Sequence, residues 1–184
     1  CAYTNEAVTR LNLLVRNKLK EAGIIKGLGK NFRVHNKSIE LLRGEQIVFE
    51  ANDHRNGILT GEVGTVIGFS SISDKETSEH ERLGHGIIRL LVNKADGSKK
   101  IVNIDTREKS VRFAYGYAMT AYKLQGASVD HTLICYEKEI GYESFNVMMT
   151  RHRDSVKLYA SQQELEDNAY SRLEADAKQA RDKY

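Results

Sequence analysis

Neutral polar groups that suit phosphate binding gather between residues 117 and 130, which read Tyr-Ala-Met-Thr-Ala-Tyr-Lys-Leu-Gln-Gly-Ala-Ser-Val-Asp. A predicted strand ends inside this stretch, and in open α/β sheets ligands bind beyond the carboxyl ends of strands. Thr120, Gln125 and Ser128 offer donors that fit phosphate oxygens without reading base sequence. Gly126 would let a backbone approach closely. On this pattern alone, a capped turn between a strand and a helix is equally consistent.

A second group of charged residues lies between a predicted helix and a predicted strand, in the run Thr-Arg-His-Arg-Asp at 150–154. Arg151 stands at the end of an element, where a planar guanidinium could reach a phosphate. The alternative is an ordinary surface arginine paired with Asp154. The two interpretations carry similar weight on the residues alone.

The composition is that of a globular chain, with 184 residues of which 40% are hydrophobic and 29% charged. This length allows one large domain or two small ones. The net charge is +3, but residues 1–35 alone hold seven basic and two acidic residues. Such an excess could attract a nucleic-acid backbone, although a solvated basic helix explains it as well.

Several classes of protein are not expected from the sequence. Cys1 and Cys135 are far apart, and the histidines lack metal-ligand spacing, so neither a disulfide framework nor a metal site is predicted. No apolar run of about 18 residues predicts a membrane span, and we expect a bacterial cytoplasmic protein. The sequence begins with Cys rather than Met, which suggests a piece of a longer chain.

The spacing of apolar residues predicts three kinds of element. A helix is expected over 7–22, with Thr4 or Asn5 as its N-cap and Gly23 as its stop. Its apolar stripe would comprise Ala7, Val8, Leu11, Leu14, Val15, Leu19 and Ala22. Strand-like runs at 45–50, 62–69, 87–92 and 100–104, the last two joined by an Asp96-Gly97 turn, predict a small β-barrel. Strands at 111–119, 132–136 and 155–159, with a helix at 143–150, then resume an α/β pattern.

These elements predict an α/β domain in two parts, residues 1–36 and 113–160, interrupted by a β-barrel over 37–112. A helix over 161–184 would follow, beginning at the capping box of Ser161 and Glu164. The stripe of apolar residues on this last helix is thin, so we expect it to dock weakly.

Four segments together resemble the RecD-like superfamily 1 DNA helicases, in particular the helicase part of TraA-type conjugative relaxases. Residues 117–130 are similar to helicase motif V, and 149–154 are similar to motif VI. The opening Tyr3-Thr4-Asn5, with Leu11-Asn12 and Arg16, resembles the motif IV region. Residues 44–48, 52–53 and 60–66 resemble an SH3-like insert. The resemblance covers about residues 1–160 and implies a RecA-like second motor domain.

The resemblance also implies roles for single residues. Arg151 would be the catalytic arginine finger that reaches the γ-phosphate of ATP, and Arg153, Gln125 and Gly126 would sense the nucleotide. The residues expected to bind DNA are Thr4, Asn5, Thr120, Tyr122, Lys123 and Ser128. Tyr122 stands where the family usually has His, but a tyrosine could still stack on a base.

The chain has no Gly-x-x-x-x-Gly-Lys-[Ser/Thr] loop, because the run from Gly27 to Lys30 is too short. ATP and Mg²⁺ would therefore be bound mainly by a first motor domain elsewhere in the full-length protein, and this segment alone should not hydrolyse ATP. The expected partners are single-stranded DNA and the N-terminal motor and relaxase domains of the same protein, with 5′ to 3′ movement. We expect no membrane and no obligate protein partner. The alternatives are a non-catalytic nucleic-acid or protein-binding module and a degenerate helicase remnant.

Overall fold

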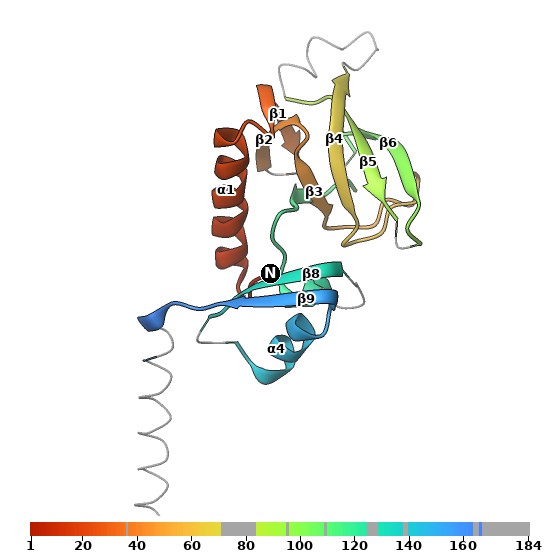
Figure 1. Cartoon of the computed structure of the whole chain (residues 1–184). Helices are drawn as coiled ribbons and strands as arrows, with labels where there is room; N and C mark the ends of the chain where they lie inside the picture. The colour runs from red at the N-terminus through yellow and green to blue at the C-terminus, as the bar shows by residue number, and fades with distance from the viewer. Residues whose placement is uncertain are drawn as a thin grey trace, which may run out of the picture. The chain divides into compact units, whose positions relative to one another are not determined.

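The computed structural model describes residues 1–35, 37–70, 84–94, 96–108, 110–124, 129–137, 140–163 and 166. The chain forms two compact units (Figure 1). The terminal unit contains Cys1–Val8 and the described residues from Met119 onward, and the inserted unit is Thr9–Ala118. Both ends of the chain thus belong to the terminal unit, and Thr9–Ala118 lies between them in sequence. The predicted division into 1–36, 37–112 and 113–160 stays a prediction.

Within its described residues, the inserted unit contains helix α1 and two antiparallel sheets. The helix is α1 (Asn5–Glu21), which begins in the terminal unit. The strands are β1 (Lys26–Val34), β2 (Lys37–Arg43), β3 (Gln46–Phe49), β4 (Val63–Ser70), β5 (Ile87–Asn93), β6 (Lys99–Asp105) and β7 (Phe113–Tyr115). Strands β1 and β2 form a hairpin, and the others form a sheet in the order β6-β5-β4-β3-β7. The four predicted runs match β3 to β6.

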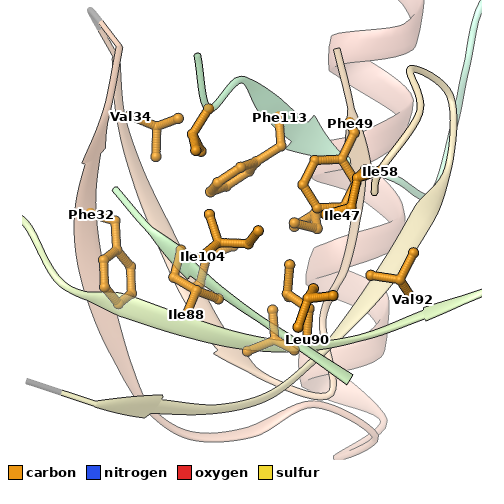
Figure 2. Packing of buried hydrophobic residues seen from close by; sticks show 14 residues of the cluster. Phe32, Val34, Ile47, Phe49, Ile58, Ile88, Leu90, Val92, Ile104 and Phe113 are labelled. Atoms are coloured by element: carbon orange, nitrogen blue, oxygen red, sulfur yellow. The ribbon is translucent and has the colours of Figure 1, made fainter. Parts of the chain in front are cut away.

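One apolar core joins the hairpin to the five-stranded sheet. Phe32, Val34 and Leu41 come from the hairpin and lie in the same cluster as Ile47, Leu90 and Ile104 from the sheet. Figure 2 shows side chains from both sheets meeting in this cluster. Burying each large apolar side chain contributes roughly 1.5–3 kcal/mol, so the two sheets are stable only together. The SH3-like identity of this unit stays a prediction.

The hairpin of β1 and β2 was not predicted, because the first half of β1 reads Lys-Gly-Leu-Gly-Lys and lacks alternation. Strand β7 is shorter than the predicted strand 111–119. Beyond it, the N–H groups of Tyr117 and Ala118 donate to Asn12 Oδ1 at 2.9 and 2.8 Å. A helix side chain therefore satisfies backbone donors that the prediction had assigned to a sheet.

The helix α1 confirms its predicted position but not its predicted buried stripe. Leu14 and Val15 are exposed, whereas Asn12 and Arg16 are buried. Asn12 Nδ2 also donates to the carbonyl of Ala118 at 3.2 Å. The face of the helix toward its unit is polar because it binds specific backbone and carboxylate groups, which apolar periodicity cannot anticipate.

Arg16 is the centre of a buried ionic cluster. Its guanidinium donates to Glu45, which is fully buried, and to Glu40 Oε2 at 2.6 Å. It also lies over the Tyr115 ring, 5.0 Å from the centroid. Desolvation opposes its charge, but hydrogen bonds to Glu40 and Glu45 raise the pKa of Arg16. Burial raises the pKa of Tyr115 to about 12, and the Tyr115 hydroxyl donates to the Glu40 carbonyl at 2.7 Å.

The terminal unit contains a parallel sheet. Strands β8 (Val129–Cys135) and β9 (His152–Tyr159) pair in parallel, and helices α3 (Ala121–Leu124) and α4 (Tyr142–Met149) accompany them. Ala121, Ile134 and Met148 form the centre of its core. These elements confirm the predicted strands at 132–136 and 155–159 and the helix at 143–150. Most of the predicted helix over 161–184 lies outside the described residues.

In the described residues, no helix is long and apolar enough to cross a membrane.

We predict that Arg16→Met lowers the free energy of unfolding by about 3–5 kcal/mol, because it leaves a buried carboxylate without its partner. Urea denaturation would measure the change. The matched control is Arg10→Met, an exposed position on the same helix, which should change stability by less than about 0.5 kcal/mol. The double variant Arg16→Met/Glu45→Gln should recover part of the loss. Equal stabilities of Arg16→Met and Arg10→Met would contradict the buried ion pair.

Candidate nucleic-acid interface

The first residues of the chain complete the parallel sheet of the terminal unit. Ala2 pairs in parallel with Thr120, and its N–H donates to the Met119 carbonyl at 3.1 Å. On the other side, the Cys1 amine donates to the Leu133 carbonyl, and the Cys135 N–H donates to the Cys1 carbonyl at 2.9 Å. The order across the sheet is therefore 119–120, 1–2, β8, β9. The segments 119–120 and 1–2 both leave the sheet at its carboxyl edge.

A pocket of about 380 Å³ lies among the residues that leave this edge. Its lining contains four residues that were predicted to bind DNA. The lining comprises Asn5, Thr120, Tyr122 and Lys123, together with Tyr3, Ala121 and Ser144. The structure therefore brings together Asn5 and the segment 120–123, which are distant in sequence and contain residues predicted to bind DNA.

The aromatic rings at this pocket are accessible. The Tyr122 side chain is 84% exposed, and Tyr3 is partly exposed as well. Thr120 is buried, and its hydroxyl accepts the N–H of Lys123 at 3.4 Å, which caps the short helix α3. The pocket thus combines a lysine, two tyrosine rings and small polar groups, which is the chemistry of a sequence-tolerant nucleic-acid contact.

Thr4 has a structural role at the N-terminus of α1. Its hydroxyl accepts the Ala7 N–H at 3.2 Å, which confirms the predicted N-cap, and donates to Glu137 Oε2 at 2.6 Å. The other carboxylate oxygen accepts the N–H of Tyr3 at 2.6 Å and the N–H of Thr4 at 3.2 Å. A carboxylate at a helix N-terminus is favourable. Glu137 therefore fixes the turn that presents Tyr3 and Asn5.

The predicted nucleotide-sensing arginines lie at the opposite edge of the same sheet. Arg151 precedes the first residue of β9, and its carbonyl accepts the N–H of Val129, the first residue of β8, at 3.0 Å. Since parallel strands start at one edge and end at the other, Arg151 and the pocket at Thr120 are on different edges. The predicted DNA-binding residues and the predicted nucleotide-sensing Arg151 thus lie on opposite edges of the sheet.

The guanidinium of Arg151 is sparsely bonded within the described part of the chain. Its Nη2 donates to Thr150 Oγ1 at 3.4 Å, and its Nε is buried with no hydrogen-bond partner there. Arg153 is exposed and lies 3.5 Å from Asp130, a weak surface pair. The alternative pairing of Arg151 with Asp154 is not seen; Asp154 lies 3.5 Å from His131 instead.

Gln125, Gly126 and Ser128 lie outside the described residues, so their predicted roles stay predictions. Sequence reasoning missed Ser144 and Glu137 as parts of this region, and it included Tyr3 only in the resemblance to motif IV. Tyr3 adjoined a residue already singled out, whereas Ser144 and Glu137 gave no signal, because their importance depends on the fold. Within the described ranges, no group of three or more His, Cys, Asp or Glu side chains could hold a metal ion.

The sequence is similar to part of the TraA conjugal transfer proteins. It is 31% identical over 158 residues to the conjugal transfer protein TraA of Agrobacterium fabrum and 29% identical over 161 residues to a probable conjugal transfer protein TraA of Sinorhizobium fredii. Each match covers 86% of this chain but only 13% of the relative. The chain therefore corresponds to a small part of those proteins. No family model matches it.

The fold is that of part of the Pif1 helicases. The crystal structure of Pif1 helicase from Candida albicans matches 95% of this chain and 48% of its own, with a TM-score of 0.58 and 14% identity. Bacteroides Pif1 bound to single-stranded DNA matches 85% of this chain and 39% of its own, with a TM-score of 0.53 and 14% identity. These matches support the predicted α/β class and a helicase-type fold, while the RecD-like subtype stays a prediction.

We predict that Glu137→Ala lowers the free energy of unfolding by about 1–2 kcal/mol, because Tyr3 and Thr4 lose their carboxylate acceptor. Chemical denaturation would measure it. Glu143→Ala, at an exposed glutamate in the first turn of α4, is the control and should have little effect. A loss no greater than that of the control would show that Glu137 does not stabilise the start of α1.

Proposed function

We propose that this chain is the second motor module of an ATP-dependent DNA helicase of the RecD-like type, within a conjugative transfer protein. In this proposal the chain supplies contacts to single-stranded DNA and an arginine finger, and the full-length protein moves 5′ to 3′. Relaxase and first motor domains of the same protein would be its partners. The similarity to TraA proteins and the Pif1-type fold support the proposal.

The observation that carries the proposal is the pocket at the carboxyl edge of the terminal unit. It gathers Asn5 with Thr120, Tyr122 and Lys123, although these segments are more than a hundred residues apart. Lys123 supplies positive charge for phosphates, and the Tyr122 ring offers an accessible face for a base. Neither side chain reads sequence, which suits a motor that must track any single strand.

The residues that are present fit a contribution to an ATP site but not the binding of ATP by this chain alone. Arg151 offers guanidinium donors that the described residues leave largely unused, as an arginine finger requires. The 184 residues contain no loop of the kind that cradles the phosphates of ATP. ATP with Mg²⁺, bound by a first motor domain, would supply the free energy for movement. The role of Arg151 would be to place positive charge against the terminal phosphate.

The location of Arg151 at the other edge of the sheet from the DNA pocket gives this proposal a mechanical basis. Short elements run between the two edges, and α4 leads from Ser144 near the pocket to Thr150 beside Arg151. Movement of a DNA-contacting side chain could therefore be transmitted along one helix to the finger. A module built in this way couples a DNA track to a nucleotide without a direct contact between them.

We predict that Tyr122→Ala weakens binding of this chain to single-stranded DNA roughly 5- to 150-fold, the range of about 1–3 kcal/mol that stacking of one base provides. Fluorescence anisotropy with a labelled oligonucleotide would measure it, and affinity should fall as salt rises. Tyr142→Ala is the matched control, because Tyr142 is 83% exposed in the same unit but does not line the pocket. Equal losses in both variants would remove the pocket from the proposal.

We predict that Arg151→Ala in the full-length protein lowers DNA-stimulated ATPase activity by about 10³-fold or more, while DNA binding is retained. Lys157→Ala, on the exposed surface of the same strand, is the control and should keep its activity. ATPase activity near that of the unchanged protein would exclude Arg151 as the finger. An unchanged full-length protein without any ATPase activity would favour a degenerate remnant.

A further inference from the structure

The hairpin of β1 and β2 in the inserted unit has a strongly basic surface. Residues 26–43 contain five basic residues, namely Lys26, Lys30, Arg33, Lys37 and Arg43, but a single acidic residue, Glu40. Glu40 is already neutralised, since Arg16 and Lys20 lie 2.6 and 3.1 Å from its carboxylate. The hairpin therefore presents positive charge that no side chain of its own offsets.

Two of these cations lie directly opposite each other. Lys26 and Arg43 are cross-strand partners at the open end of the hairpin, and both are exposed. Like charges in this position destabilise a sheet, and neither residue has an ion-pair partner among the described residues. An anion bound between the two side chains would relieve their repulsion.

An apolar side chain projects beside this cationic pair. Leu28 is 97% exposed, which is the highest value among the exposed large apolar residues that the structure describes. It lies in an irregular stretch where β1 advances from Lys26 to Lys30 while β2 advances only from Arg43 to Leu41. The first four residues of β1 are all exposed.

Two glycines flank Leu28, and a side chain at either position would be unfavourable. Gly27 has a φ of +100°, which L side chains rarely adopt. A Cβ on Gly29 would lie 2.4 Å from the Glu40 carboxylate, which is fixed by Arg16 and Lys20. The bulge therefore depends on both glycines and on the buried ionic cluster. The irregular stretch of β1 thus presents an exposed leucine, Leu28, between Lys26 and Lys30.

We propose that the open end of the β1–β2 hairpin binds double-stranded nucleic acid. Lys26 and Arg43 contact phosphates, and Leu28 packs against the edge of a base step. Proteins that bind duplexes insert apolar residues such as leucine between or beside stacked bases, with cations on the adjoining phosphates. This site shares no residue with the pocket at the carboxyl edge of the terminal unit. The inference rests on the proposed function in one respect, namely that the partner is a nucleic acid.

The charge component is tested with the 184-residue chain and a blunt DNA duplex of about 15 base pairs. Lys26→Ala/Arg43→Ala should weaken duplex binding at least 10-fold and reduce the slope of log affinity against log salt by about 2. Arg89→Ala/Lys99→Ala is the matched control, because it removes two exposed cations from the sheet of the same unit. Equal losses in the two double variants would overturn the site.

The apolar component is tested with Leu28→Ala, which should weaken duplex binding several-fold without changing the salt slope. Leu59→Ala is its control, since Leu59 is also an exposed leucine of the inserted unit. Wild-type affinity of Leu28→Ala for the duplex would overturn the assignment of Leu28. Binding of poly-glutamate as tight as that of the duplex would overturn the assignment to nucleic acid.

The same variants separate this inference from the proposed function. Lys26→Ala/Arg43→Ala should keep its affinity for a single-stranded oligonucleotide, whereas Tyr122→Ala should keep its affinity for the duplex. Loss of single-strand binding only in Tyr122→Ala, with duplex binding lost only in the hairpin variants, supports both. Duplex binding unaffected by every hairpin variant defeats the inference and leaves the proposed function standing.

Discussion

Backbone pairing of the first two residues between Thr120 and Cys135 is the constraint on which the terminal unit depends. Parallel sheets are covered on both faces, and Ala2 is fully buried at this position. Because this pairing brings together residues more than a hundred positions apart, the whole inserted unit must fold in a way that returns the chain to the same place. The candidate interface exists only as a consequence of that return.

Within the inserted unit, polar contacts of α1 fix the segment that ends at Ala118. Asn12 binds both N–H groups and a carbonyl of Tyr117 and Ala118, the last residues before the chain enters the terminal unit. Arg16, one turn later, binds the carboxylates of Glu40 and Glu45. Each of these polar contacts takes the place of apolar packing and requires one hydrogen-bonding geometry. The helix is thereby fixed in register as well as in orientation, which burial of leucines alone would not achieve.

Local pattern predicted most elements, whereas their partners depended on tertiary structure. The alternation in β3 to β6 and the Asp96-Gly97 turn were sufficient to place four strands, because each signal lies within a few residues. The burial of Arg16 and the exposure of Leu14 were not predictable, since both follow from carboxylates that are distant in sequence. Likewise Thr120 was identified from its position after a predicted strand and Lys123 from the resemblance to helicase motif V, but the contribution of Glu137 and Ser144 required the fold. The identity of the insert as SH3-like and the roles of Gln125, Gly126 and Ser128 stay predictions.

The location of polar residues on the two edges of one small sheet limits how such a module can work. At the carboxyl edge, Glu137 binds Thr4 and the Thr120 hydroxyl caps α3, so the backbone of these segments is fixed to the sheet. Arg151 is linked by its carbonyl to the start of β8 and is equally fixed to the sheet. Under the proposed function, communication between the edges would involve movement of the sheet and its two helices as a body, or a change in the helices themselves. Helix α4 has only eight residues, and its N-cap, Gly141, provides no side-chain hydrogen bond. It is thus the less constrained of the two routes, and a short helix with a weak start can shift at a lower free-energy cost than paired strands can.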